Sequence, residues 1–164
     1  MTAKYHEGSL NINYIDYSIA TRSLDIFFAG CLMSPKCKDC CNPELMDFNN
    51  GTLFTNWLPK ISFYLDTYRK LIYNIFLVGG SPNHQDPVKM EAFLTGLRRH
   101  CGDSVDIYAF CGEGIDEVQD VLKKHCDYIK VGAYIPELKC DNNYQYGIKL
   151  ATSNQMILKK GMDY

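Results

Sequence analysis

The chain has 164 residues, of which 46% are hydrophobic and 22% are charged, and its formal net charge at pH 7 is −2. This composition is ordinary for a soluble globular protein, and the near-neutral charge gives no electrostatic reason to expect nucleic acid or a membrane as partner. The length allows one hydrophobic core and is short for two, so residues 1–164 are predicted to form a single domain.

The location of the protein is predicted from what the sequence lacks. No apolar run approaches the length of a membrane span, and the segment 1–6 lacks the apolar stretch of a secretory signal. We therefore expect a cytoplasmic protein. In that reducing compartment, the eight cysteines favour a metal, a cluster or free thiols over disulfides. Four of them stand alone among apolar or helical neighbours and are expected to be small buried hydrophobes: Cys101, Cys111, Cys126 and Cys140.

Four apolar runs typical of strands alternate with segments of helical length. Strands are predicted at 24–29, 74–78, 105–110 and 128–131, and helices at 57–73, 87–100 and 115–124. Asp86 is the expected N-cap of the second helix, because Pro87 suits the first helical position. This alternation predicts an α/β protein with a parallel sheet and right-handed crossovers. The polar stretch 139–147 is expected to be a surface loop.

The residues that stand out chemically follow the ends of the predicted strands. Cys31, the pair Gly79-Gly80, the pair Cys111-Gly112 and Gly132 each come directly after one strand or close behind it. Parallel sheets place their chemistry at the carboxyl ends of the strands, so these residues should share one rim. A closed barrel of eight strand–helix units typically needs about 250 residues, so this chain can build only an open part of one. A wide mouth of that kind suits a macromolecular substrate.

The loop after the first predicted strand holds four cysteines. Cys37 and Cys40 have the two-residue separation of ligands that share one metal centre, and Cys31 can reach the same centre through a five-residue loop that Pro35 stiffens. Three thiolates on a four-iron cluster would leave one iron open to a small molecule. The alternative is a structural zinc site that uses Cys41 as a fourth thiolate.

The cysteine loop with Asn42-Pro43-Glu44, together with Gly79-Gly80-Ser81-Pro82, resembles the radical S-adenosylmethionine (SAM) enzymes. The likeness is closest to the activating proteins of anaerobic ribonucleotide reductases. It covers most of the chain and includes Arg22 and the segments 108–112, 131–134 and 152–155. The fold that this resemblance implies is an open partial (β/α) barrel of the radical SAM type.

The resemblance also implies the cofactors and their residues. A [4Fe–4S] cluster would be bound by Cys31, Cys37 and Cys40, and SAM would be held at the open iron. The residues that would contact the cofactors are Asp39, Cys40, Cys41, Gly79, Gly80 and Ser81. The glycines, which lack a Cβ, would let the backbone approach the bound nucleoside or amino acid. No catalytic side chain is required beyond the cluster.

The chain departs from the family pattern at three places. The spacing from Cys31 to Cys37 is longer than usual, which should cost only roughly a few tenths of a kcal/mol in loop closure. Cys41 stands where the family commonly has an aromatic residue or histidine, so Cys40 is favoured as the third ligand. Ser81 replaces a usual acidic residue, so contacts to the SAM ammonium would come from backbone carbonyls or the serine hydroxyl.

The function that the resemblance implies is the activation of a glycyl-radical enzyme. The substrate would be the large subunit of a class III ribonucleotide reductase, and the electron donor would be flavodoxin or a similar protein. Two alternatives stay open: a radical SAM enzyme acting on a small molecule, such as a deazaguanine synthase, and a zinc-binding adaptor without catalysis. His84 is expected to be a solvent-facing loop residue, and Asn154-Gln155 either shapes the nucleotide side of the mouth or caps a turn.

Overall fold

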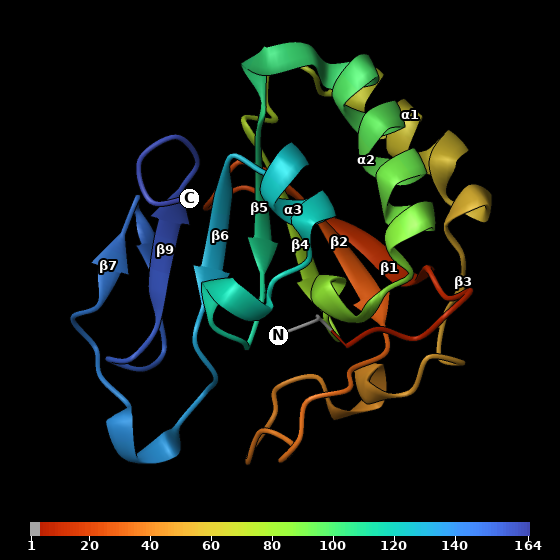
Figure 1. Cartoon of the computed structure of the whole chain (residues 1–164). Helices are drawn as coiled ribbons and strands as arrows, with labels where there is room; N and C mark the ends of the chain where they lie inside the picture. Colours follow the sequence, from red (N-terminus) through yellow and green to blue (C-terminus); the bar gives the residue numbers. More distant parts are fainter. Residues whose placement is uncertain (1–3) are drawn as a thin grey trace.

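The computed structural model describes residues 4–164, which form a mixed α/β fold (Figure 1). Its strands are β1 (Asn11–Ser18), β2 (Ser23–Ala29), β3 (Thr52–Leu53), β4 (Asn74–Gly79), β5 (Asp106–Phe110), β6 (Tyr128–Val131), β7 (Tyr144–Gln145), β8 (Ile148–Lys149) and β9 (Met156–Lys159). Its α-helices are α1 (Leu58–Thr67), α2 (Pro87–Cys101) and α3 (Asp120–His125). Seven strands form one sheet in the order β3-β1-β2-β4-β5-β6-β9, and β7 pairs with β8 in a separate hairpin.

The centre of the sheet is parallel, as the sequence predicts. β2, β4, β5 and β6 are neighbours that run in the same direction, and a helix lies between each strand and the next along the chain. The edges differ from the prediction, because β1, β3 and β9 are antiparallel to their neighbours. The sheet is therefore mixed: the predicted parallel sheet forms its centre, and antiparallel strands that were not predicted form both edges. The predicted loop 139–147 also contains one strand of the β7–β8 hairpin.

Two predicted helices are shorter in the structure, and in each case competing hydrogen bonds explain the difference. α1 ends at Thr67, because the chain must then turn so that the backbone N–H groups of Tyr73 and Asn74 can donate to the carbonyl of Arg22 beside β2. α3 begins only at Asp120. The segment before it is held by Gln119, whose amide donates to two carbonyls of the loop after β4.

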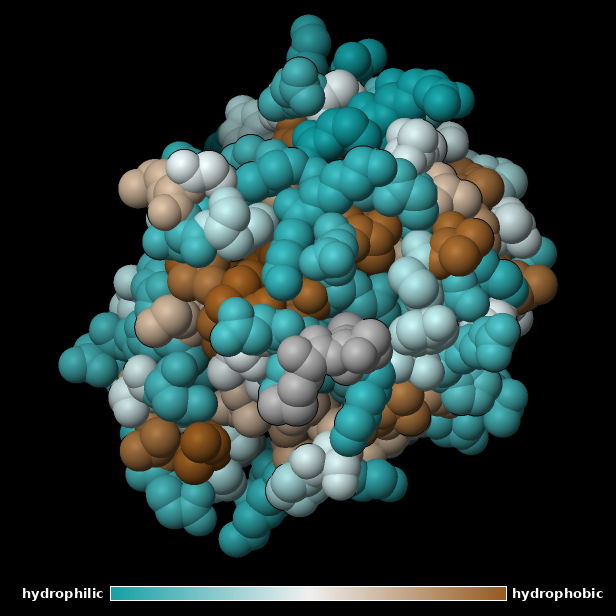
Figure 2. All heavy atoms as spheres, viewed as in Figure 1, coloured by the Kyte–Doolittle hydropathy of each residue, from teal (hydrophilic) through white to brown (hydrophobic). Residues whose placement is uncertain are grey.

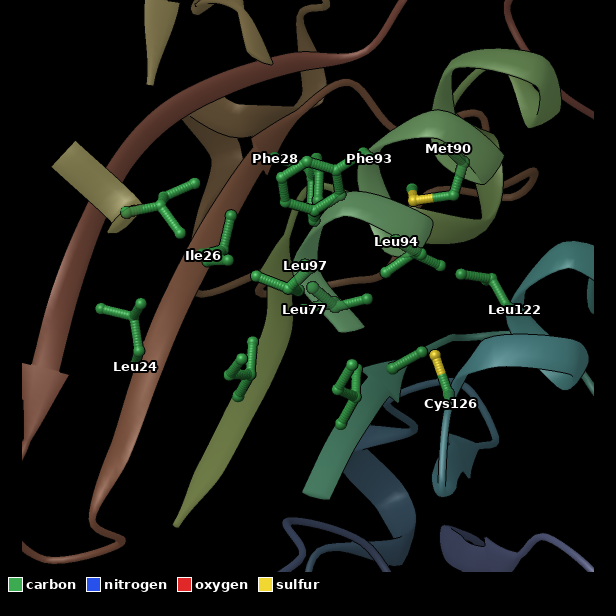
Figure 3. Packing of buried hydrophobic residues seen from close by; sticks show 14 of the residues in the cluster. Leu24, Ile26, Phe28, Leu77, Met90, Phe93, Leu94, Leu97, Leu122 and Cys126 are labelled. Atoms are coloured by element: carbon green, nitrogen blue, oxygen red, sulfur yellow. The ribbon is translucent and has the colours of Figure 1, made fainter. Parts of the chain in front are cut away.

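The main hydrophobic core lies between the sheet and its helices. Alternate residues of β2 and β4, such as Leu24, Ile26 and Leu77, point toward α2, where they meet Phe93 and Leu97 (Figure 3). The opposite face of the sheet carries a second, smaller cluster that includes Phe76, Tyr108, Leu150 and Ile157. All three α-helices contribute to the first cluster and none to the second, so they cover one face only.

The surface that faces the viewer in Figure 2 shows hydrophobic residues as separate patches among hydrophilic ones. Within residues 4–164, no helix combines the length and the apolar character that crossing a membrane requires.

Candidate functional site

The carboxyl ends of the four parallel strands meet at one edge of the sheet. The loop over residues 31–42, here called the cysteine loop, follows β2 at this edge and hangs below the sheet in Figure 1, where the arrowheads of β5 and β6 point. The loop after β4 begins with Gly80, and the loop after β5 begins with Cys111. The predicted rim is therefore formed by the segments that the sequence analysis assigned to it.

A cavity of about 490 Å³ opens between these loops, within the roughly 300–1,000 Å³ that is usual for small-molecule sites. We call it the cysteine cavity. Every residue predicted to bind a metal or cofactor lines it: Cys31, Cys37, Asp39, Cys40, Cys41, Gly79, Gly80 and Ser81. Cys111, which was predicted to lie on the rim, lines it too, as do Met33 and Lys130, to which the sequence had given no role.

The thiols share the cavity without converging on one point. Among residues 4–164, no group of three or more His, Cys, Asp or Glu side chains lies close enough together to hold a metal ion. Burial raises the pKa of the Cys40 thiol, and the neighbouring thiols add to this rise through charge repulsion. A positively charged metal centre would reverse that balance, because it stabilises thiolates.

The cysteine loop is anchored only at its two ends. Before it, the N–H of Gly30 donates to the carbonyl of Leu45 at 2.8 Å, and the N–H of Cys31 donates to the carbonyl of Met46 at 3.2 Å. In the described part of the chain, the backbone of residues 33–41 takes part in no hydrogen bond. The thiols can therefore be drawn together by a cluster without breaking regular structure.

The double glycine brings the loop after β4 directly against the start of the cysteine loop. Gly79 has a φ of +99°, a conformation that favours glycine, and the N–H of Gly80 donates to the carbonyl of Phe28 at 2.7 Å. A Cβ added to Gly80 would lie 2.5 Å from the carbonyl oxygens of both Gly30 and Leu45. The space that the sequence analysis reserved for a ligand at Gly80 is thus occupied by the protein's own backbone.

Ser81 carries an unused hydrogen-bonding group in the wall of the cysteine cavity. Only 3% of the residue is exposed, and its Oγ has no hydrogen-bond partner among the described residues. A buried hydroxyl without a partner is costly in a folded protein and is typical of a place where a ligand supplies the missing bond. This position therefore fits a polar group of a bound small molecule.

Lys130 brings a positive charge to the same cavity. Its Nζ donates to the carbonyl of Gly132 at 2.7 Å and to that of Cys111 at 3.3 Å, and no described carboxylate forms an ion pair with it. Burial lowers the pKa of this ammonium, and nearby thiols act in the opposite direction. Only one feature of the sequence indicates that this lysine faces the cavity, and it is weak: the lysine stands between apolar residues at the end of a predicted strand.

His84 is buried, so the expectation of a solvent-facing residue is wrong. Only 3% of it is exposed, its Nε2 lies against Oε1 of Glu113, and its Nδ1 accepts the N–H of Leu32 at 2.9 Å. Burial acts to lower the pKa of the imidazole, but Cys31 and Glu113 outweigh it and raise the pKa to about 9. The bond from Leu32 opposes this rise, because only a ring with a lone pair on Nδ1 can accept it.

The structure also places the segment Asn154-Gln155 and the four cysteines outside the cysteine loop. Gln155 lines the cysteine cavity and also holds a turn, since its Oε1 accepts the N–H groups of Ala151 and Thr152. Gln155 therefore caps a turn, and a part in shaping the nucleotide side of the mouth stays a prediction. Cys101, Cys111 and Cys126 are buried as expected, whereas Cys140 is partly exposed.

These residues fit an iron–sulfur cluster with a small-molecule ligand. The three thiols of Cys31, Cys37 and Cys40 come from one loop that can close, and they open onto one cavity. The unpartnered hydroxyl of Ser81 and the ammonium of Lys130 lie in the wall of that cavity and suit a ligand with polar groups.

Residues 21–158 match the family described as 4Fe-4S single cluster domain. No curated protein and no solved structure matches the chain.

Proposed function

The chain belongs to the family of 4Fe-4S single cluster domains, and from this premise we propose that it is a radical SAM activase. Its reaction would generate a glycyl radical on the large subunit of an anaerobic ribonucleoside-triphosphate reductase. When bound, the cluster and SAM would supply the chemistry, a one-electron cleavage to methionine and a 5′-deoxyadenosyl radical. The activity would reside in a single domain with the open, partial-barrel form of a radical SAM fold.

One observation carries the proposal. The three candidate ligands and the Gly79-Gly80-Ser81 turn, which lie about 40 residues or more apart in the sequence, line one cavity at the carboxyl ends of parallel strands. A structural zinc site would need the cysteines but would have no use for the cavity or for the unpartnered Ser81 hydroxyl. The combination favours a cluster with a bound small molecule over an adaptor.

The residues of the chain would bind and orient rather than act as acids or bases. Cys31, Cys37 and Cys40 would hold the cluster, and the Ser81 hydroxyl would contact the amino-acid part of SAM. Asp39 and Cys41 line the same cavity and would complete the contacts on the loop side. The apolar residues in the cavity wall, such as Val78 and Phe110, would exclude water from a reactive intermediate.

The nature of the substrate is inferred from the shape of the sheet. All three α-helices cover one face, and the strands run from edge to edge in an open order. An open site of this kind can accept a loop of a large protein, whereas an enzyme for a small substrate normally encloses it. The electron donor would be flavodoxin or a similar protein, and all eight free cysteines fit a reducing compartment such as the cytoplasm.

The cluster is tested first, by anaerobic reconstitution followed by iron and sulfide analysis. We expect about four irons and four sulfides per chain. Serine at Cys31, Cys37 or Cys40 should abolish binding, whereas Cys41→Ser should retain it. Cys140→Ser is the matched control, because Cys140 does not line the cysteine cavity. Stoichiometric zinc without sulfide would support the adaptor instead.

The reaction is tested with the reconstituted, reduced protein. It should convert SAM to 5′-deoxyadenosine and methionine, as chromatography would show. With the large reductase subunit present, electron paramagnetic resonance should show a glycyl radical doublet that disappears when the target glycine is replaced by alanine. SAM cleavage without that signal, accompanied by modification of a small molecule, would replace the activase with a small-molecule radical SAM enzyme.

A further inference from the structure

One imidazole ties together the loops that follow three parallel strands. His84 lies in the loop after β4, in a short 3-10 turn over Pro82–His84. Its Nδ1 accepts the N–H of Leu32 in the loop after β2, at 2.9 Å, and its Nε2 is paired with Glu113 in the loop after β5. The side chains of His84 and Glu113 are 4% and 8% exposed. The contact is thus internal to the rim of the site.

The hydrogen bond to Leu32 lies just before the part of the cysteine loop whose backbone makes no described hydrogen bond. Leu32 directly follows Cys31, and in the described part of the chain the backbone of residues 33–41 makes no hydrogen bond. The path of the chain at Cys31 is therefore fixed by two bonds, one from its own N–H to Met46 and one from Leu32 to His84. The latter is the last anchor before the segment that carries the other thiols.

We propose that His84 is a positioning residue for the cluster, which fixes the backbone at Cys31, and that Glu113 holds its ring in the required tautomer. This inference rests on the proposed function only in taking Cys31 as a ligand. The Leu32 N–H needs a lone pair on Nδ1, so the ring proton must be on Nε2, which faces Oε1 of Glu113. Groups that orient ligands in this way commonly tune how tightly a metal centre is held.

The burial of the pair argues against a purely structural role. Both carboxylate oxygens of Glu113 are buried and neither has a regular hydrogen-bond partner among residues 4–164, although Oε1 lies against Nε2 of His84. A buried carboxylate whose hydrogen bonds are so poorly satisfied is a poor source of stability, because apolar residues of similar volume can often replace such a group without loss. What apolar residues could not reproduce is the acceptor that faces the Leu32 N–H.

The test compares His84→Ala with His84→Asn, whose side-chain amide oxygen can stand near the position of Nδ1. Hydrogen exchange at the Leu32 amide is measured by NMR on the metal-free protein. His84→Ala should speed exchange at Leu32 about tenfold relative to wild type, the effect of losing one hydrogen bond, and His84→Asn should remain close to wild type. Glu113→Leu should also speed exchange, whereas Glu113→Gln, which can still accept the Nε2 proton, should not.

A second measurement follows the reconstituted protein in the presence of an iron chelator. Iron should leave His84→Ala roughly 10–100 times faster than wild type, with partial rescue in His84→Asn. The inference is overturned if Leu32 exchanges equally in wild type and His84→Ala, or, where the alanine variant does not fold, if His84→Asn loses protection at Leu32. Because exchange is measured without metal, this result is independent of whether the protein cleaves SAM.

Discussion

Replacing Gly80 with alanine tests how the rim of the site is built. The added Cβ would lie 2.5 Å from the carbonyl oxygens of Gly30 and Leu45 and 2.8 Å from the backbone nitrogen of Gly30. These atoms belong to the hydrogen bond that holds the start of the cysteine loop, from the Gly30 N–H to the Leu45 carbonyl at 2.8 Å. Backbone on both sides cannot yield as a flexible side chain would, so the loop itself must move.

The expected cost is large for a single methyl group. Overpacking typically costs about 1–3 kcal/mol, and weakening the Gly30 bond adds about 1 kcal/mol. We therefore expect the free energy of unfolding of the metal-free protein to fall by about 2–4 kcal/mol, out of a total of about 5–15 kcal/mol. Urea unfolding under reducing, anaerobic conditions measures this change, and iron uptake on reconstitution should fall with it.

Gly96 provides the matched control. It lies within α2, and a Cβ there would meet no atom within 4 Å. Gly96→Ala should therefore stabilise the protein by about 0.5–1 kcal/mol, because alanine is the better helix former. If Gly80→Ala unfolds at the wild-type urea concentration and only its affinity for SAM falls, the backbone argument is refuted and the glycine serves the ligand instead.

Three further predictions concern neighbouring groups. Ser81→Ala removes an unpartnered buried hydroxyl, so it should leave the free energy of unfolding of the metal-free protein unchanged or raise it by up to about 1 kcal/mol. It should nevertheless weaken SAM binding, measured by titration of the cluster-loaded protein. Lys130→Met should make the midpoint potential of the cluster more negative in a redox titration, because the more anionic reduced state loses a nearby positive charge; an unchanged potential would place the ammonium outside the field of the cluster. Burial acts to raise the pKa of Asp86, but the backbone N–H groups of Gly8, Lys89 and Val88 outweigh it and lower the pKa. Its charge should therefore stabilise the fold above about pH 4 and lose this effect as the pH falls through the lowered value, so Asp86→Asn should cost about 0.5–1 kcal/mol at pH 7 and progressively less in acid unfolding curves.

The parallel part of the fold could be predicted because each strand carries its own signal. The four central strands are rich in buried apolar residues, interrupted by Asp25 in β2 and Lys130 in β6, and they are found within about a residue of the predicted bounds. β1 was not predicted, although it pairs with β2, the next strand along the chain, whereas β9 was missed because its pairing is decided by a distant partner. β9 comes from the last ten residues of the chain and pairs with β6 across the intervening hairpin.

The candidate site could be predicted wherever one short segment held the information. The cysteine loop and the Gly79-Gly80-Ser81 turn are such segments, and the structure places both on one cavity. His84 and Lys130 could not be found in this way, because their roles depend on groups supplied by other loops: Leu32 and Glu113 for the imidazole, and the thiols of the cavity for the ammonium. A histidine in a polar loop has no local feature that distinguishes burial from exposure.

The separation between the main core and the cysteine loop has a consequence for biogenesis. None of residues 31–42 belongs to the hydrophobic cluster between the sheet and the helices, and the backbone of residues 33–41 adds no described hydrogen bond to the fold. The energy that folds the chain is therefore gained without the metal, unlike in zinc fingers, where metal binding supplies it. A newly synthesised chain can therefore fold before iron and sulfide are delivered to it. A chain whose cluster has been destroyed by oxygen keeps its fold, on which a repair system can assemble another cluster.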